Sequence, residues 1–179
     1  MIELIDNYIG QMIDILKRRN MYEHTLIIFC ADHGEMLGDH GMYHKSVPYD
    51  PSIRIPLILR GPGVKISGES DALVQLFDLH PTILETAGIK PPNYIDAKSL
   101  VPILSGKKEK VHNFQFIELY DRSTNYQMIC DGRFKVIINT FDKNEMYDRE
   151  NDPEELNNII DKYPKIQAKL YKALREMNI

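Results

Sequence analysis

Apolar residues recur at helical spacing in the first part of the chain, over residues 2–17. The residues that share this spacing are Ile2, Ile5, Ile9, Met12, Ile13 and Leu16. Steps of three and four residues place them on one side of a helix, so the pattern predicts an amphipathic helix with a single apolar face. Gly10 lies inside this pattern at a cost of roughly 1 kcal/mol relative to alanine, and we interpret it as the mark of a close packing contact.

Two continuous apolar runs follow, at residues 25–31 and 55–59, and neither alternates with polar residues. Such runs are typical of strands buried on both faces, as in a parallel sheet covered by helices. A helix is predicted after the second run, with Asp78 as its N-cap and Gly88 as its stop. The proline-containing stretch at residues 90–105 is interpreted as a connector.

The second half of the chain has shorter strand-like segments. Strands are predicted at residues 114–119, 126–130 and 133–140. The dipeptide Asp131-Gly132 between the last two is a typical hairpin turn. Two helices are predicted to close the chain, one after Asp152-Pro153 and one that starts near Pro164.

These elements predict an α/β fold in two parts. Residues 1–105 are expected to form the C-terminal part of a large α/β layer, and residues 106–179 a small α+β subdomain with antiparallel strands. Two strands with few helices cannot cover both faces of a sheet, so the first part is expected to be incomplete, with its other strands in a segment that precedes residue 1. An exposed apolar face is then expected there, which other copies can cover by self-association.

The composition excludes several classes of protein. The chain has 179 residues, of which 43% are hydrophobic and 27% charged, as in soluble globular proteins. Its net charge of −4 argues against nucleic acid as the main partner, and no apolar run has the roughly twenty residues of a membrane-spanning helix. Cys30 and Cys130 are too few for a disulfide framework. The N-terminus lacks the layout of a secretory signal, so the compartment is left open, with the cytoplasm expected if the chain is complete.

The segment with the most chemistry is the polar loop at residues 32–45, which begins where the first predicted strand ends. Sites in open α/β sheets form at the carboxyl ends of strands. Asp32 and His33 leave the strand in succession, and they can present an oxygen and a nitrogen to one divalent cation such as Ca²⁺, Mg²⁺, Mn²⁺ or Zn²⁺. The alternative is that Asp32 caps a turn and that His33 lies in a polar loop without a metal. Arg54 is expected to anchor the loop by an ion pair or to contact substrate.

The longer string around this loop resembles a known family. TLIIFCADHGEMLGDHGMYHKSVPYDPSIRIPLILRGPG, at residues 25–63, is similar to the second signature region of the sulfatases, in the alkaline-phosphatase-like superfamily. Further segments that resemble this family are LFDLHPT, SLVPIL, EMYD and NDP, at residues 76–82, 99–104, 145–148 and 151–153. The resemblance spans nearly the whole chain and implies an incomplete alkaline-phosphatase-like sheet layer in its first part.

The resemblance also implies roles for residues of the loop. Asp32 and His33 are implied as ligands of a single divalent metal, usually calcium in this family, and Lys45 as a cation that contacts the sulfate or the leaving-group oxygen. A divalent ion and a lysine both stabilise the negative charge of a sulfate-ester transition state. His40 and His44 are further candidates for substrate binding, either by orienting other groups or by protonating the leaving group.

Two parts of the family's active site have no counterpart in the chain. The family's nucleophile lies in a Cys/Ser-x-Pro-x-Arg cassette, whose cysteine is oxidised to formylglycine, and neither Cys30 nor Cys130 has that context. The early Asp-Asp pair that completes the metal shell is also absent. Two ligands leave a divalent ion short of the roughly six that it prefers, so the metal site of the chain alone is expected to be weakly bound or empty.

The resemblance therefore implies the C-terminal fragment of a sulfuric ester hydrolase, inactive without its N-terminal half. Its implied substrate is an organic sulfate ester, either a small molecule or a glycan. Two alternatives stay open. One is a phosphodiesterase or phosphonate monoester hydrolase of the same superfamily, which the identity of the nucleophile would distinguish, and the other is a non-catalytic module.

Overall fold

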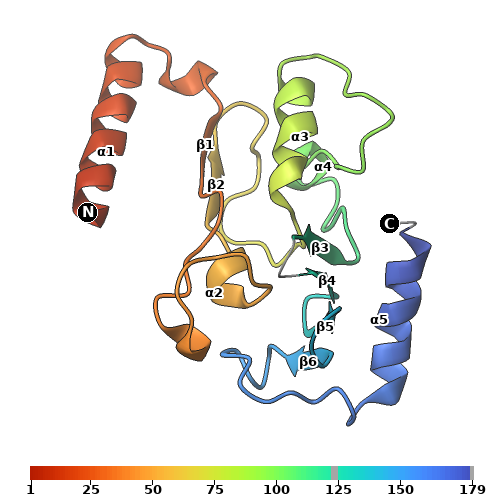
Figure 1. The fold of residues 1–179 in the computed structure, drawn as a ribbon. Helices are drawn as coiled ribbons and strands as arrows, with labels where there is room; N and C mark the ends of the chain where they lie inside the picture. Colours follow the sequence, from red (N-terminus) through yellow and green to blue (C-terminus); the bar gives the residue numbers. More distant parts are fainter. Residues whose placement is uncertain (122–124, 178–179) are drawn as a thin grey trace.

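The computed structural model describes residues 1–121 and 125–177 of the chain. The first helix, α1 (Ile2–Arg18), forms as the apolar spacing predicts, and in Figure 1 it stands apart from the rest of the molecule. None of its residues is buried. A methyl group added at Gly10 would meet nothing within 4 Å, so the close packing contact inferred for this glycine was wrong.

The two apolar runs form strands β1 (Ile27–Cys30) and β2 (Leu57–Arg60), which pair with each other. Their pairing is antiparallel, with Ile28 opposite Leu59, so the prediction of parallel strands was wrong for this pair. Burial on both faces was also wrong, because Phe29 is 38% exposed and Ile58 is 62% exposed. Each strand has a single neighbour in the described chain, which leaves an edge and part of one face open.

The first part of the chain also contains short helical segments. The 3₁₀ segments are η1 (Tyr22–His24), η2 (Asp39–Gly41) and η3 (Leu76–Asp78), and the α-helices are α2 (Asp50–Ile53), α3 (Leu79–Thr86) and α4 (Val101–Leu104). In Figure 1, α3 and α4 lie on the opposite side of β1 and β2 from α1. Helix α4 falls within the stretch predicted as a connector, and its Ile103 and Leu104 are buried with Leu100 against Leu57 and Leu59. The connector is therefore part of the core of the first part.

Asp78 plays a different role from the predicted helix cap. Its side chain makes no cap hydrogen bond to α3. The carboxylate is fully buried and accepts hydrogen bonds from the backbone N–H groups of Gln75 and Lys98 and from the imidazole of His112. It joins three separate segments, which a sequence pattern for a local cap cannot show.

The second part contains a four-stranded antiparallel sheet in the order β3-β4-β5-β6. Its strands are β3 (Gln115–Tyr120), β4 (Asn125–Cys130), β5 (Phe134–Asn139) and β6 (Glu145–Asp148). The predicted hairpin joins β4 and β5: Gly132 has a φ of 101°, and the Asp131 carboxylate accepts a hydrogen bond from the Phe134 N–H. The sequence analysis identified residues 145–148 as a motif but did not predict that they form a strand.

Both faces of this sheet are covered. Helix α5 (Pro164–Glu176), predicted from Pro164, packs Leu170 and Leu174 against one face and runs beside the sheet in Figure 1. On the other face, Tyr49 and Ile53 pack against the sheet, which brings α2 of the first part onto the second part. The predicted α/β layer followed by an α+β subdomain is confirmed, and the division between residues 105 and 106 stays a prediction.

The helix predicted after Asp152-Pro153 was wrong, because residues 153–162 form turns and irregular chain. The Asp152 carboxylate accepts hydrogen bonds from the N–H groups of Leu156 and Asn157. Glu155 has a φ of 57°, which a right-handed helix does not contain. The segment is therefore held as a turn by side-chain contacts that replace helical hydrogen bonds.

No helix in the described parts of the chain combines the length and the hydropathy that crossing a bilayer requires. The exposed apolar face expected on the first part is present on α1. It comprises Ile2, Leu4, Ile5, Tyr8, Met12 and Ile15, which are between 42% and 85% exposed. Self-association through this face stays a prediction.

Candidate metal and anion site

The carboxyl end of β1 leads directly into Asp32 and His33, and two backbone hydrogen bonds fix the chain immediately after them. The Gly34 N–H donates to the Ser52 carbonyl oxygen at 2.7 Å, and the Glu35 N–H donates to the Pro51 carbonyl oxygen at 2.9 Å. A methyl group on Gly34 would lie 1.9 Å from the Pro51 oxygen, so only glycine permits this approach. Helix α2 therefore sets the position at which the Asp32-His33 pair leaves the strand.

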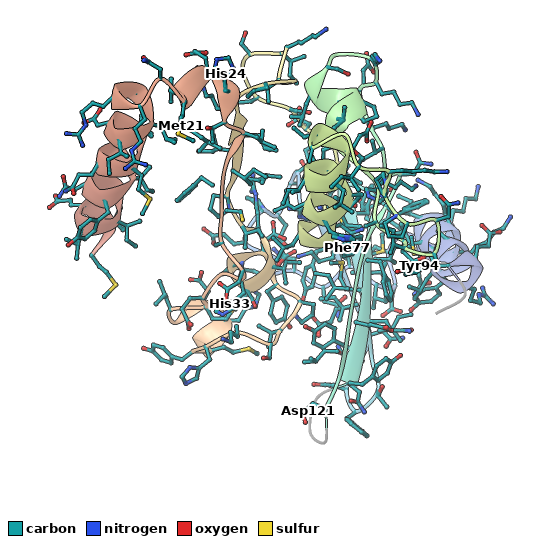
Figure 2. All side chains as sticks on the ribbon, turned by 90° about the horizontal axis from the view of Figure 1, so that it is seen from above. Met21, His24, His33, Phe77, Tyr94 and Asp121 are labelled. Atoms are coloured by element: carbon teal, nitrogen blue, oxygen red, sulfur yellow. The ribbon has the colours of Figure 1, made fainter. Side chains whose placement is uncertain are left out.

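The His33 ring is held from two sides. Its Nδ1 lies 2.7 Å from the Gly34 carbonyl oxygen, which can only accept, so Nδ1 carries the proton and donates. The lone pair is consequently on Nε2, where the Lys45 ammonium donates to it at 2.7 Å. Figure 2 shows His33 on its loop, at the opposite end of the β1–β2 pair from Met21 and His24.

Asp32 lies beside this pair, with its Oδ2 3.5 Å from the His33 Nε2. The side chain of Asp32 is 84% exposed. Its pKa is lowered from the ordinary value, chiefly because its Oδ1 accepts a hydrogen bond from the His33 backbone N–H. Asp32 is therefore an accessible carboxylate, and the structure brings together a carboxylate, an imidazole lone pair and an ammonium.

The loop that carries Lys45 is closed on itself around a buried side chain. Met36 is fully buried, and its N–H donates to the His44 carbonyl oxygen at 2.9 Å. His44 and Ser46, on either side of Lys45, have φ values of 72° and 75°. Positive φ in non-glycine residues is costly and persists where the surroundings enforce it. The backbone at Lys45 is thus set by an unusual local conformation.

The other two candidate histidines lie away from this group. His40 stacks on the Tyr49 ring with centroids 4.2 Å apart, and its Nε2 lies 3.1 Å from the Glu154 carbonyl oxygen. The exposed side chain of His44 has no hydrogen-bond partner in the described parts of the chain. The structure therefore places His40 in a packing role and leaves substrate binding by His40 and His44 as predictions.

Arg54 makes no ion pair within residues 1–121 and 125–177, although one was expected as an anchor for the loop. Its exposed side chain lines a cleft of about 440 Å³, together with His40 and Glu154. A contact between Arg54 and substrate stays a prediction.

Asp32 and His33 can supply part of the ligand set of one divalent cation. An ionised carboxylate oxygen and an imidazole with its lone pair on Nε2 suit hard and borderline cations. Within the described residues, no group of three or more His, Cys, Asp or Glu side chains is arranged to hold a metal ion. Asp32 and His33 could thus supply two ligands of a site whose other ligands come from outside the described chain.

The sequence analysis missed the contacts that position this pair. The carbonyl oxygens of Pro51 and Ser52 and the ring of Tyr49 act by geometry, and none has a sequence signal for a site. Pro51, near the start of α2, is a signal that could have predicted a local helical turn there.

Comparisons with known proteins place this chain among sulfatases. Residues 38–179 match the family described as N-sulphoglucosamine sulphohydrolase, C-terminal. The chain is 32% identical to arylsulfatase K of Rattus norvegicus over 96% of its length, and 34% identical to choline-sulfatase of Rhizobium meliloti over 98% of its length. These matches cover 33% and 35% of the relatives, so the chain spans about a third of the curated proteins that it resembles.

Two solved structures resemble the chain over nearly its whole length. One that was solved in complex with its substrate D-glucosamine-2-N,6-O-disulfate has a TM-score of 0.90 and 32% identity, with 98% of this chain and 38% of that chain covered. The phosphonate monoester hydrolase of Agrobacterium radiobacter has a TM-score of 0.85 and 29% identity, with 99% of this chain and 40% of that chain covered.

Proposed function

The chain belongs to the sulfatase family, as a C-terminal portion of the N-sulphoglucosamine sulphohydrolase type, and we propose that it supplies part of an active site that hydrolyses organic sulfate esters. The observation that carries the proposal is the convergence of Asp32, His33 and Lys45 at the end of β1. The substrate class is proposed from the relatives, which include sulfatases of aryl, choline and amino-sugar sulfates.

In this proposal, Asp32 and His33 hold one divalent cation, most readily Ca²⁺. When bound, such a cation supplies positive charge that stabilises the oxygens of the sulfate group. Lys45 supplies a second positive charge from an exposed position, and its ammonium can donate hydrogen bonds to an anion. The Gly34 carbonyl holds the His33 Nδ1–H, which keeps the lone pair on Nε2.

The Cys/Ser-x-Pro-x-Arg cassette that holds the nucleophile in sulfatases has no counterpart in the sequence. Burial raises the pKa of the Cys130 thiol, which makes it a poor nucleophile, and Cys30 lies within β1. We therefore propose that a further segment supplies the nucleophile and the remaining metal ligands. The open face of α1 and the exposed side of β1 and β2 are the surfaces that this segment would cover.

Lys45 gives the proposal a specific test, because the imidazole has one lone pair on Nε2 and Lys45 occupies it. A cation and the Lys45 ammonium compete for that lone pair. Lys45→Ala is therefore expected to raise the affinity of the chain for Mn²⁺, about fivefold or more, since a hydrogen bond contributes about 1 kcal/mol and one from an ammonium contributes more. The same change is expected to abolish turnover in the whole protein, because the anion loses its cation.

The activity test compares the isolated chain with the whole protein that contains it, using 4-nitrophenyl sulfate and a phosphonate monoester. We expect no turnover by the chain alone, and sulfate turnover by the whole protein that Asp32→Asn abolishes. Asp39→Asn is the matched control, since Asp39 is an exposed carboxylate of the same loop. If the isolated chain turns over a substrate and Asp32→Ala abolishes that turnover, the proposal that the chain is inactive alone is wrong.

The alternative is a phosphonate monoester hydrolase or phosphodiesterase, and the likeness to the Agrobacterium radiobacter enzyme favours it over unrelated activities. It retains the same roles for Asp32, His33 and Lys45. Faster hydrolysis of the phosphonate or phosphodiester than of the sulfate ester by the whole protein would select this alternative.

A further inference from the structure

Four charged side chains meet where α2 packs against the four-stranded sheet, and we call them the anchor cluster: Asp50, Lys135, Arg149 and Glu155. Lys135 is fully buried on β5, and its Nζ lies 2.6 Å from the Asp50 Oδ1 and in contact with the Glu155 Oε1. Arg149 donates to the Asp50 Oδ2 from Nη2 at 2.5 Å and from Nε at 3.1 Å. Two cations and two anions therefore balance inside the molecule.

Hydrogen bonds to the backbone extend the anchor cluster. The Asp50 N–H donates to the Glu155 Oε2 at 2.8 Å, and the Lys135 ammonium donates to the Pro48 carbonyl oxygen at 3.1 Å. Burial alone would raise the pKa of Asp50, but Lys135 and Arg149 outweigh burial and lower it. Asp50 is thus held as an anion at the first residue of α2, with its side chain and its N–H both bound to the second part of the chain.

The same short helix holds the candidate site. Asp50 directly precedes Pro51 and Ser52, whose carbonyl oxygens accept the hydrogen bonds from Glu35 and Gly34. Gly34 in turn follows His33 and supplies the carbonyl oxygen that orients its ring. A continuous set of contacts therefore runs from Lys135, inside the sheet, through α2 to the imidazole of His33.

A second contact joins the same two regions. The His40 ring, in the site loop, lies 3.1 Å from the Glu154 carbonyl oxygen and stacks on Tyr49, which directly precedes Asp50. The positive φ of Glu155 turns its carboxylate into the anchor cluster instead of continuing a helix. The segment after Asp152 is thus shaped to contact both α2 and the site loop.

We propose that Asp50 and Lys135 are positioning residues for Asp32 and His33, so that the C-terminal subdomain determines the geometry of the cation and anion site through α2. The inference rests on the proposed function of that site. Buried ion pairs add little stability relative to apolar side chains of equal volume, whereas removing one partner leaves an uncompensated charge. Directional contacts, in contrast, select one arrangement of α2, which is what a site with two ligands of defined orientation requires.

The test uses the isolated chain, because amide exchange can be measured there without activity. Lys135→Met removes the central cation, and Glu155→Gln is a milder variant that keeps its volume. Lys169→Met is the matched control, since it removes an exposed ion pair with Asp131 in the same subdomain. Hydrogen exchange at single amides is followed by NMR, together with Mn²⁺ binding detected by line broadening at His33.

In the folded variants Lys135→Met and Glu155→Gln, we expect the Gly34 and Glu35 amides to exchange about tenfold faster or more. This acceleration should exceed any change at the β4 and β5 amides, which report global unfolding, because exchange at single amides measures local opening separately. Mn²⁺ affinity at His33 falls in parallel, and Lys169→Met changes neither. Equal acceleration of all amides, or unchanged exchange at Gly34 and Glu35 in Glu155→Gln, would overturn the proposal. Absence of Mn²⁺ broadening at His33 in the unaltered chain, even at high Mn²⁺ concentration, would count against the proposed function alone, since the exchange data test positioning independently.

Discussion

Gly34 is the residue at which the fold and the candidate site meet, so Gly34→Ala is the sharpest perturbation of the site that leaves every charge in place. The added methyl group would lie 1.9 Å from the Pro51 carbonyl oxygen, and contacts under 3.0 Å essentially never occur. The loop and α2 must therefore separate by more than about 1 Å. The 2.7 Å and 2.9 Å hydrogen bonds from Gly34 and Glu35 cannot survive that separation.

Each of these hydrogen bonds contributes about 1 kcal/mol net. We therefore expect Gly34→Ala to lower the free energy of unfolding by about 2 kcal/mol, which corresponds to a fall in Tm of about 4–8 °C for a chain of this size. The His33 ring should also lose its fixed orientation, because the Gly34 carbonyl oxygen that accepts from its Nδ1 moves with the loop.

Urea unfolding followed by circular dichroism measures the free energy, and the nitrogen chemical shifts of His33 report its tautomer. Gly10→Ala is the control, because a methyl group there meets nothing within 4 Å and should raise helix stability by roughly 1 kcal/mol. An unchanged urea midpoint and an unchanged His33 tautomer in Gly34→Ala would refute the argument that α2 holds the site loop through this close approach.

Three further outcomes test other parts of the structure. The pKa of Asp148 is lowered to about 2, chiefly by its hydrogen bonds with Arg133. Its contribution to the free energy of unfolding is therefore present above the ordinary pKa of 3.8 and is lost as the pH falls toward 2. Asp148→Asn should flatten the pH dependence of the urea midpoint across that interval, and an unchanged slope would contradict this. Thr82 is fully buried and accepts a hydrogen bond from the Leu100 N–H at 2.8 Å. Thr82→Val should therefore lower the free energy of unfolding, measured in urea, by about 1–3 kcal/mol. An unchanged free energy would show that another group satisfies this N–H. Ile5 is 52% exposed on the apolar face of α1. Ile5→Glu should therefore lower any self-association measured by sedimentation without changing the unfolding of the sheet. Equal association of the variant and the unaltered chain would exclude this face as the contact.

Local patterns predicted the elements that depend on local forces. The spacing of apolar residues identified α1, Pro164 identified the start of α5, and the Asp131-Gly132 dipeptide identified the β4–β5 hairpin. The apolar runs located β1 and β2 but carried no information on strand direction, because continuous hydrophobicity does not identify the neighbouring strand. Their antiparallel pairing therefore became clear only from the structure.

In the candidate site, too, local motifs were predictable from the sequence and long-range contacts were not. Asp32, His33 and Lys45 were identified from a contiguous motif, and the structure places them together. The groups that support them were missed because their partners are far apart in the sequence: Lys135 meets Asp50 across 85 residues, and Asp50 meets Glu155 across 105. The same long-range contact explains the wrong helix after Asp152, since Glu155 adopts a left-handed conformation while its carboxylate contacts Lys135.

The proposed site requires that Asp32 and His33 share one divalent cation, and NMR titration of the isolated chain with Mn²⁺ tests this most directly. The predicted result is line broadening centred on Asp32 and His33 that saturates only at high Mn²⁺ concentration, because two ligands bind a divalent ion weakly. It is reversed by excess Ca²⁺, absent in Asp32→Asn and retained in Asp39→Asn. Broadening that is centred elsewhere, or that persists unchanged in Asp32→Asn, would contradict the claim that these two side chains form the cation site.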